Sequence, residues 1–163
     1  MKLLNFSSFS SPTKLIREGW PKFIKIPGGK RLFSTLVGNF IPYTGSISPL
    51  VTSIEDHKAS VFLKDRRAVR NHLDSIHAIA LANLGEFTTG LCVISQLQEK
   101  SKAILVKIEI EYLKKARGDL LSTAEQIIEK SITEDTDFKV KAEIKNLQDE
   151  IVCVLHATWR VRP

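Results

Sequence analysis

Residues 75–97 read SIHAIALANLGEFTTGLCVISQL, and this stretch decides the fold. It is apolar on nearly every side of a helical wheel, and Asp74 and Ser75 at its start are possible N-caps. A helix of this kind must be surrounded by other elements. Its length would also suit a membrane span, but a histidine, an asparagine, a glutamate and two glycines lie inside it, and amphipathic strands flank it. We therefore predict a buried central helix.

Alternating apolar and polar residues on both sides of this helix predict β-strands. Before it, the alternation begins at Ile47 and resumes after a turn at Glu55, as in a hairpin. After it, two stronger alternations predict strands with one buried and one solvent-exposed face. The residues expected on the buried faces are Val106, Ile108, Ile110 and Tyr112 in the first strand and Phe138, Val140, Ala142 and Ile144 in the second. Residues 118–128 and 151–161 complete the pattern, the latter after a polar turn near Gln148. We expect the α+β class, with an antiparallel sheet of five to six strands curled around the helix.

The first 45 residues are predicted to form a helical extension. Apolar residues between Pro12 and Ile41 recur at spacings near three and four, which indicates two short helices. Residues 27–29, Pro-Gly-Gly, would separate these helices, and residues 42–45, Pro-Tyr-Thr-Gly, would follow the second as a turn. We therefore divide the chain into an extension, residues 1–45, and a domain, residues 46–163.

The net charge of +6 comes from one end of the chain. Residues 1–31 hold seven Lys and Arg against Glu18 alone, so the remaining residues carry 17 basic and 17 acidic side chains. A neutral body argues against a nucleic-acid partner, which would need cations clustered on the folded domain. The basic residues of the extension are interleaved with apolar ones, as in helices that lie on membranes, so residues 12–41 are a candidate for peripheral membrane contact.

The two cysteines and the first residues of the chain predict the cellular compartment of the protein. Cys92 and Cys153 lie 61 positions apart and belong to no CxxC pair, so we expect buried apolar residues in a reducing compartment. The start of the chain lacks an apolar core of signal-peptide length. Its serine content resembles an organelle transit peptide, but we favour a cytoplasmic protein. No metal or other cofactor is expected.

Glu86 and His77 are the candidates for chemistry within the predicted helix. Glu86 is the one side chain expected to be charged between Ser75 and Gln98, and a carboxylate in an apolar helix is costly unless it is paired or used. The structural alternatives are that Glu86 lies on a solvent-exposed stripe of the helix or forms a salt bridge. His77 would lie in the first turn, where backbone N–H groups and the helix dipole can stabilise an oxyanion. A lone histidine there can equally be structural.

The spacing of these two residues predicts a dimer. They are nine positions apart, which places them on opposite faces of one helix and about 13 Å apart along its axis. They cannot act together on one substrate within a single helix. If both act on the same substrate, each site takes one of them from each of two protomers, in a symmetric dimer with two composite sites.

The segment around the helix start resembles the hotdog-fold acyl-CoA thioesterases. In the hydroxybenzoyl-CoA and phenylacetate-pathway members, an amide residue precedes a His-Gly-Gly helix start by six positions, and an Asp or Glu follows that histidine by nine. Asn71, His77 and Glu86 match this pattern. The resemblance covers residues 47–162 and is closest to a branch of unknown function with a helical N-terminal extension. It implies a hotdog fold, with two protomers paired edge to edge.

The resemblance also implies roles for individual residues. Glu86 would act as nucleophile or general base, and the N–H of Ala78 would bind the thioester carbonyl. Asn71 and His77 would orient that carbonyl. No metal is needed for this reaction.

The sequence departs from the family pattern where the substrate would approach. Ala78 and Ile79 stand in place of two glycines, and Gly90, preceded by Thr89, stands where those relatives often have a hydroxyl residue. Ile79, Thr89 and Gly90 are the residues that we expect beside the acyl group. The phosphates of CoA would bind one of two clusters of cations: Arg66, Arg67 and Arg70, or Lys114, Lys115 and Arg117.

We therefore predict a thioesterase of fatty acid metabolism that hydrolyses a fatty or aromatic acyl-CoA as a homodimer or homotetramer. The first alternative is a non-catalytic acyl-CoA or lipid-binding protein, because Ala78 and Ile79 favour packing over close approach of a carbonyl. The second is a hotdog hydratase or dehydratase, in which the histidine and acid usually have a different spacing. Apolar residues of the extension, including Trp20 and Phe23, would either cover an acyl-chain tunnel or pack on the sheet.

Overall fold

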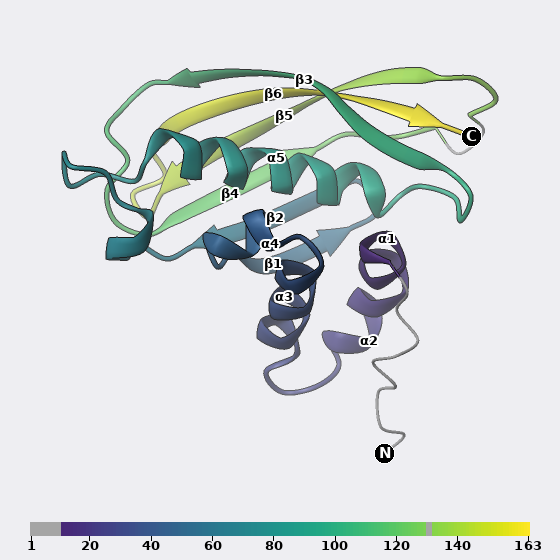
Figure 1. The fold of residues 1–163 in the computed structure, drawn as a ribbon, viewed down its shortest axis with the longest axis horizontal. Helices are drawn as coiled ribbons and strands as arrows, with labels where there is room; N and C mark the ends of the chain where they lie inside the picture. Colours follow the sequence, from purple (N-terminus) through teal and green to yellow (C-terminus); the bar gives the residue numbers. More distant parts are fainter. Residues whose placement is uncertain (1–10, 130–131) are drawn as a thin grey trace.

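A curled antiparallel sheet wraps one long helix, α5 (Ala78–Ile94), with shorter helices on one side, in a computed structural model that describes residues 11–129 and 132–163 (Figure 1). The sheet has six strands in the order β1-β2-β4-β5-β6-β3. They are Leu50–Glu55 (β1), Lys58–Leu63 (β2), Lys102–Tyr112 (β3), Leu120–Glu125 (β4), Thr136–Asn146 (β5) and Ile151–Arg162 (β6). The predicted α+β architecture, with a sheet around a central helix, is confirmed.

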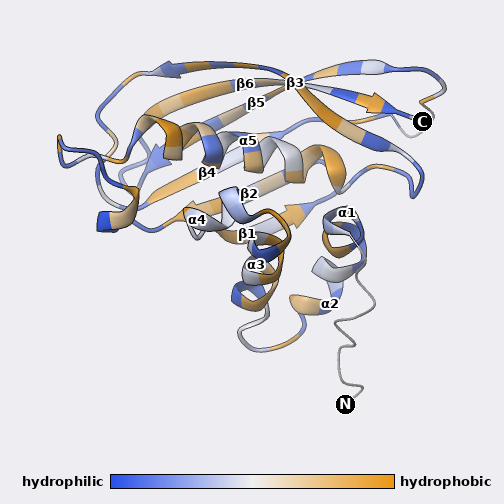
Figure 2. Cartoon of the chain, in the orientation of Figure 1, coloured by the Kyte–Doolittle hydropathy of each residue, from blue (hydrophilic) through white to orange (hydrophobic). Residues whose placement is uncertain are grey.

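The core lies between α5 and the face of the sheet that curls around it. Alternate strand residues point to this face and are fully buried, among them Val61, Leu120, Ala142 and Leu155. The helix is hydrophobic over much of its length (Figure 2). It packs so closely on β6 that a Cβ added at Gly85 would lie 2.9 Å from Leu155 Cδ1. A side chain at this position would therefore push the helix off the sheet.

Helix α5 is shorter at both ends than the sequence predicted. The expected start at Ser75 is wrong because the chain before the helix is held extended: the N–H of Ile76 donates to Ala116 O, and the N–H of His77 donates to Val69 O, both at 2.8 Å. The N-cap is therefore His77. Within the described residues, no helix combines the length and the apolar character needed to cross a membrane.

Strand β3 contradicts the expectation that one of its faces is buried. It is an edge strand that pairs with β6 on one side, and no strand of the described residues pairs with its other side. Between 38% and 48% of the surface of four apolar residues is exposed along it: Ile104, Val106, Ile108 and Tyr112. The alternation forms a strand as predicted, and Leu105 and Ile110 are partly buried against the core, but the described residues leave these four side chains more than a third exposed. Such an edge is a site for pairing with another chain.

The helices of the extension cover the opposite edge of the sheet (Figure 1). They are α1 (Pro12–Lys14), the π-helix η2 (Leu15–Gly19), α2 (Trp20–Phe23), α3 (Gly29–Phe40) and α4 (Pro42–Ser46). The break at residues 27–29 is confirmed, and Gly28 there has a φ of +72°. The turn expected at residues 42–45 is instead a short helix, because proline at its first position favours a helix start.

The apolar residues of the extension share one hydrophobic cluster with the sheet and α5. Trp20 and Phe23 are buried, and each packs edge-on against Phe33, with ring centroids 5.1 and 5.9 Å away. These two aromatic residues therefore pack in the core, the second of our expectations for them. The apolar side chains that the extension leaves more than a third exposed include Ile24, Leu32 and Phe40.

Three side chains of the extension also bind backbone groups of the edge strand β1. The bonds join Val51 N–H to Ser34 Oγ (2.9 Å), Lys30 Nζ to Thr52 O (2.6 Å) and Trp20 Nε1 to Ile54 O (3.0 Å). These groups would otherwise be free to pair with a further strand. The extension therefore closes the β1 edge, whereas the β3 edge stays open.

The hydrogen bond at Ser34 gives a test of this closure. We expect Ser34→Ala to lower the free energy of unfolding by about 1–3 kcal/mol, because it leaves the buried N–H of Val51 without an acceptor. Urea unfolding measures the loss. The matched control is Thr35→Ala, which removes an exposed hydroxyl bonded to Arg31 O and should change the free energy by less than about 0.5 kcal/mol. Equal losses in both variants would contradict a role for the Val51 bond.

Candidate active site

His77 is the N-cap of α5. Its ring Nδ1 accepts a hydrogen bond from the N–H of Ile79 at 3.1 Å. A ring nitrogen that accepts is unprotonated, so the ring proton lies on Nε2, which is left as a donor. The sequence predicted His77 inside the first turn, and the structure places it one position before the helix. Because the backbone N–H of Ile79 now holds the ring, its orientation is fixed.

The backbone N–H of Ala78 has no acceptor in the described part of the chain. The first bond of α5 runs from Leu81 N–H to His77 O at 3.1 Å, and the N–H of Ile79 is taken by the histidine ring. The Ala78 N–H therefore remains available at the positive end of the helix dipole. A donor of this kind can stabilise an oxyanion.

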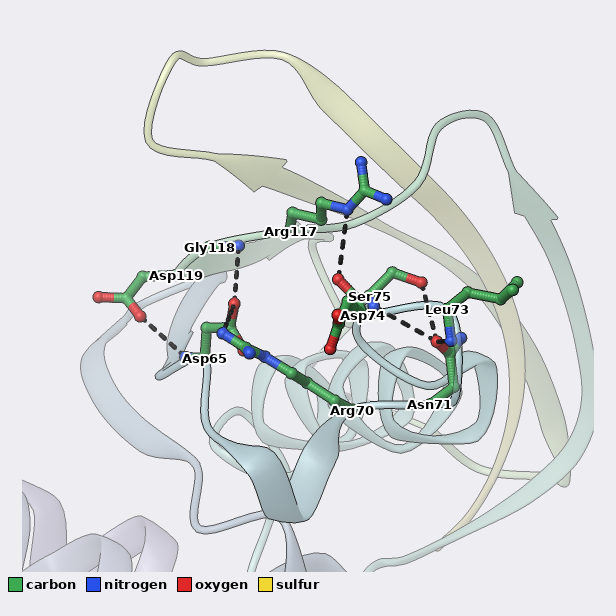
Figure 3. Close-up of polar contacts among 9 residues, drawn as sticks. All are labelled: Asp65, Arg70, Asn71, Leu73, Asp74, Ser75, Arg117, Gly118 and Asp119. Atoms are coloured by element: carbon green, nitrogen blue, oxygen red, sulfur yellow. Dashed lines mark hydrogen bonds and ion pairs between the residues drawn. The ribbon is translucent and has the colours of Figure 1, made fainter.

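Asn71 holds the turn that precedes the helix (Figure 3). Its Oδ1 accepts hydrogen bonds from Leu73 N–H at 2.9 Å, from Ser75 N–H at 3.3 Å and from Ser75 Oγ at 3.1 Å. The side-chain carbonyl is thus fully engaged in structure. The amide Nδ2 has no partner among residues 11–129 and 132–163, so it is the part of Asn71 that can donate to a substrate.

A polar network around Asp65 joins this loop to the start of β4 (Figure 3). Asp65 accepts two bonds from the guanidinium of Arg70, at 2.7 and 3.0 Å, and one from the N–H of Gly118 at 2.9 Å. Its own N–H donates to Asp119 Oδ1 at 2.8 Å. The bonds from Arg70 and Gly118 lower the pKa of Asp65 below its ordinary value. The network thereby positions the chain that leads to His77.

Most cations of the two clusters predicted to bind CoA phosphates already have partners. Arg70 is paired with Asp65, and its expected contact with a phosphate stays a prediction. Bonds also run from Arg66 Nη2 to Ser46 O (2.9 Å) and Ser48 Oγ (3.1 Å), from Lys114 Nζ to Glu150 Oε1 (2.7 Å), and from Arg117 Nε to Asp74 O (3.2 Å). Arg67 and Lys115 are exposed and unpaired within the described ranges. These two remain able to meet a phosphate without breaking a bond.

Glu86 is partly buried in the middle of α5. With Ile79 and Ala82 it forms a stripe at helical spacing that the sheet leaves partly uncovered, while most of the neighbouring helix residues are buried. No group of the described residues gives its carboxylate a hydrogen bond or an ion pair, so none of them forms the salt bridge considered as an alternative. Burial raises the pKa of Glu86 above its ordinary value. A desolvated, unpaired carboxylate is suited to act as a base.

A pocket of about 230 Å³ lies beside the start of α5. From the helix it is lined by His77, Ile79, Ala80 and Asn83, and from the other side by Tyr43, Ser46, Ile47, Ala68, Val69 and Arg70. Glu86 is not part of this lining. A single chain therefore gathers His77, Ala78 and Ile79 at one place and leaves Glu86 outside that pocket.

Thr89 and Gly90 do not support the substrate contacts expected of them. Thr89 is fully buried, where its hydroxyl donates to Glu86 O at 2.8 Å and accepts from Trp159 Nε1 at 3.1 Å. A Cβ at Gly90 would lie 3.1 Å from the Trp159 ring. Both positions pack α5 against β6, and their expected contact with a substrate stays a prediction.

Three further residues near the helix start were missed by the sequence predictions. Asn83 Nδ2 donates to Tyr43 O at 3.2 Å, and Tyr112 Oη donates to Ala78 O at 3.1 Å. Asn83 carried a signal, because it is a polar residue in an apolar helix. The two tyrosines carried none, because their approach depends on the path of α4 and β3 through space.

Several solved structures share this fold. A structural-genomics target is 26% identical, with a TM-score of 0.77 over 93% of this chain and 97% of that one. A Pseudomonas aeruginosa protein of unknown function is 17% identical, with a TM-score of 0.70 over 84% and 96%. A thioesterase of Staphylococcus aureus is 18% identical, with a TM-score of 0.67 over 75% and 99%. These likenesses confirm the hotdog fold.

Two further comparisons concern the sequence. A search of the curated proteins finds no match. A family model described as a domain of unknown function, DUF4442, matches residues 29–161. This range takes in α3, α4, the whole sheet up to β6 and α5, and so includes the candidate site. The chain therefore belongs to the DUF4442 family.

Proposed function

We propose that the protein is a thioesterase that hydrolyses fatty or aromatic acyl-CoA. The observation that supports this most is the carboxylate of Glu86, which is partly buried, unpaired within the described residues and on the uncovered stripe of α5. The free N–H of Ala78 supplies the second group that the reaction needs. Two proteins of the same fold, from Staphylococcus aureus and Haemophilus influenzae, are named thioesterases.

The Staphylococcus aureus thioesterase adds support for the pair of polar residues. It has been crystallised with alanine in place of a glutamine and, separately, of a glutamate that lies 15 positions further on. Asn71 and Glu86 of this chain have the same separation. An amide and an acid at this spacing are thus present in both proteins.

In the proposed reaction Glu86 takes a proton from a water molecule, whose oxygen attacks the thioester carbonyl carbon. A direct attack by the Glu86 carboxylate is the variant of this step, followed by hydrolysis of the anhydride. The Ala78 N–H and the helix dipole stabilise the oxyanion. The Nε2–H of His77 and the Nδ2 of Asn71 orient the carbonyl. When the C–S bond breaks, the CoA sulfur takes up the proton that Glu86 received.

The proposal includes a homodimer with composite sites. Within one chain, Glu86 does not line the pocket at His77, which supports a second protomer as the source of the carboxylate. The open β3 edge, with its exposed apolar residues, is suited to pair with its own copy. Tyr112 of that strand already contacts the helix start, so pairing along β3 would bring the partner close to the site.

Mixed dimers test whether the sites are composite. A dimer of one His77→Ala protomer and one Glu86→Ala protomer keeps one intact site if each site combines both chains. Random mixing should then restore about a quarter of the wild-type activity, although each variant alone is inactive. The measurement is thiol release by the two co-expressed variants. A mixture as inactive as its components would show that both residues act within one chain.

One observation favours a second candidate, a non-catalytic protein that binds acyl-CoA. Ile79 stands where relatives have glycine, and 52% of its surface is exposed at the pocket. Its side chain would occupy space near the oxyanion position. A panel of short, long and aromatic acyl-CoAs decides between the two: thiol release supports the thioesterase, and tight binding without release supports the binding protein.

A further inference from the structure

A second hollow, larger than the pocket at His77, lies on the outer side of the sheet. It is a groove of about 840 Å³ between α3, α4 and the strands β1 and β2. Leu50 and Phe62 form its floor, where they are direct partners across the two strands and point away from the core. Gly38 and Pro42 contribute to its helical wall. The volume lies in the range of sites for small molecules.

The charge of this groove is one-sided. Arg31 and Lys64 lie at its rim, both exposed and without an ion pair or hydrogen bond among residues 11–129 and 132–163. No aspartate or glutamate lines it. Neighbouring cations differ in this respect, since Lys30 bonds to Thr52 O and Arg66 to Ser46 O. An apolar groove with two unpaired cations is complementary to an apolar molecule that carries a negative charge.

The backbone around the groove argues against an extended peptide as its occupant. A peptide would bind by adding a strand to β1, but Val51 N–H, Thr52 O and Ile54 O already have partners in the extension. The occupant must therefore be held by apolar contact and by charge.

We infer that this groove binds a free fatty acid, with the alkyl chain along Leu50 and Phe62 and the carboxylate at Arg31 and Lys64. The site is separate from the pocket at His77 because α4 stands between them. Pro42 and Gly45 line the groove, whereas Tyr43 and Ser46 line the pocket. The inference does not depend on the proposed hydrolysis.

The test is calorimetric titration of the full chain with dodecanoate below its micelle concentration. The double variant Arg31→Ala/Lys64→Ala should weaken this binding about tenfold, because both cations that pair with the carboxylate are lost. Lys25→Ala, which removes an exposed cation of the same extension that does not line the groove, should leave the affinity unchanged. Dodecyltrimethylammonium, with the same chain and the opposite charge, should not bind there.

A second variant tests binding in the groove by filling its space, without changing its charge. Thr35 is exposed and lines the groove, so Thr35→Trp should fill the space and abolish the binding without unfolding the protein, as circular dichroism would confirm. Glu86→Gln should leave the same binding intact, which separates this site from the proposed active site. The inference is overturned if dodecanoate does not bind, or if its binding survives both Thr35→Trp and the double substitution.

Discussion

Replacing Glu86 with glutamine is expected to reduce thioester hydrolysis by about a thousandfold or more, without lowering the melting temperature. Glutamine has nearly the same shape but cannot accept a proton from water or attack a carbonyl. Here the melting temperature should stay constant or rise, because the carboxylate is partly buried and unpaired in the described chain.

The sign of the stability change follows from the pKa of Glu86. Burial raises this pKa in the folded state, so above the ordinary value of 4.5 the folded protein holds a proton more tightly than the unfolded chain does. The stability contribution of Glu86 is therefore lost as the pH rises through the raised pKa, and glutamine removes this loss at neutral pH. For the same reason kcat/KM of the wild type should rise with pH through a pKa above 4.5.

Thiol release from an acyl-CoA and differential scanning calorimetry at pH 7 measure the two effects. The control is Glu99→Gln, at an exposed position beyond the end of α5, which should change neither. Activity retained in Glu86→Gln would exclude Glu86 as base or nucleophile. A large drop in melting temperature would instead show that the carboxylate stabilises the fold through a partner.

Placing lysine at Val106 and Ile108 together is expected to convert the proposed dimer into monomers and to remove nearly all of the proposed activity. Both residues are exposed on the open edge strand β3, and charged side chains on an edge strand prevent its pairing. Two like charges on each chain would face two on the other across the two-fold axis. Because the proposed site needs both protomers, activity should be lost with the dimer.

Sedimentation velocity reports the oligomeric state, and thiol release on the same samples reports activity. The control is Leu147→Lys, which introduces the same charge at a 67% exposed residue between β5 and β6, away from the β3 edge. This variant should remain dimeric and active. An active monomer of the double variant would contradict the composite site, and an unaltered dimer would place the interface elsewhere.

The sequence was sufficient to predict the central helix and the strands, because both depend on local periodicity. Strands β2, around Val61, and β5, around Val140, form where apolar and polar residues alternate. Helix α5, around Leu84, forms where apolar residues occupy nearly every side of a helical wheel. The helix start was predicted wrongly because bonds to distant residues, Val69 and Ala116, keep the chain extended up to His77.

The candidate site could be predicted only in part. The motif residues Asn71, His77 and Glu86 are placed by spacing along one segment, which a sequence displays directly. The burial of Thr89 against Trp159 and the pairing of Arg70 with Asp65 depend on which partner the fold brings near, and periodicity carries no information on that. The apolar residues of β3 were predicted to be buried, because apolar residues that alternate with polar ones are typical of a strand with one face in the core. Four of them are exposed instead.

The closure of β1 by the extension has a further consequence for how many copies can associate. A sheet with two free edges could add chains at both ends without limit and grow into a filament. Hydrogen bonds from Ser34, Lys30 and Trp20 occupy the β1 edge. In the described structure this leaves the β3 edge for pairing with a further strand. If two copies pair along β3 as proposed, the assembly would end at two molecules. The extension would then prevent polymerisation through the sheet.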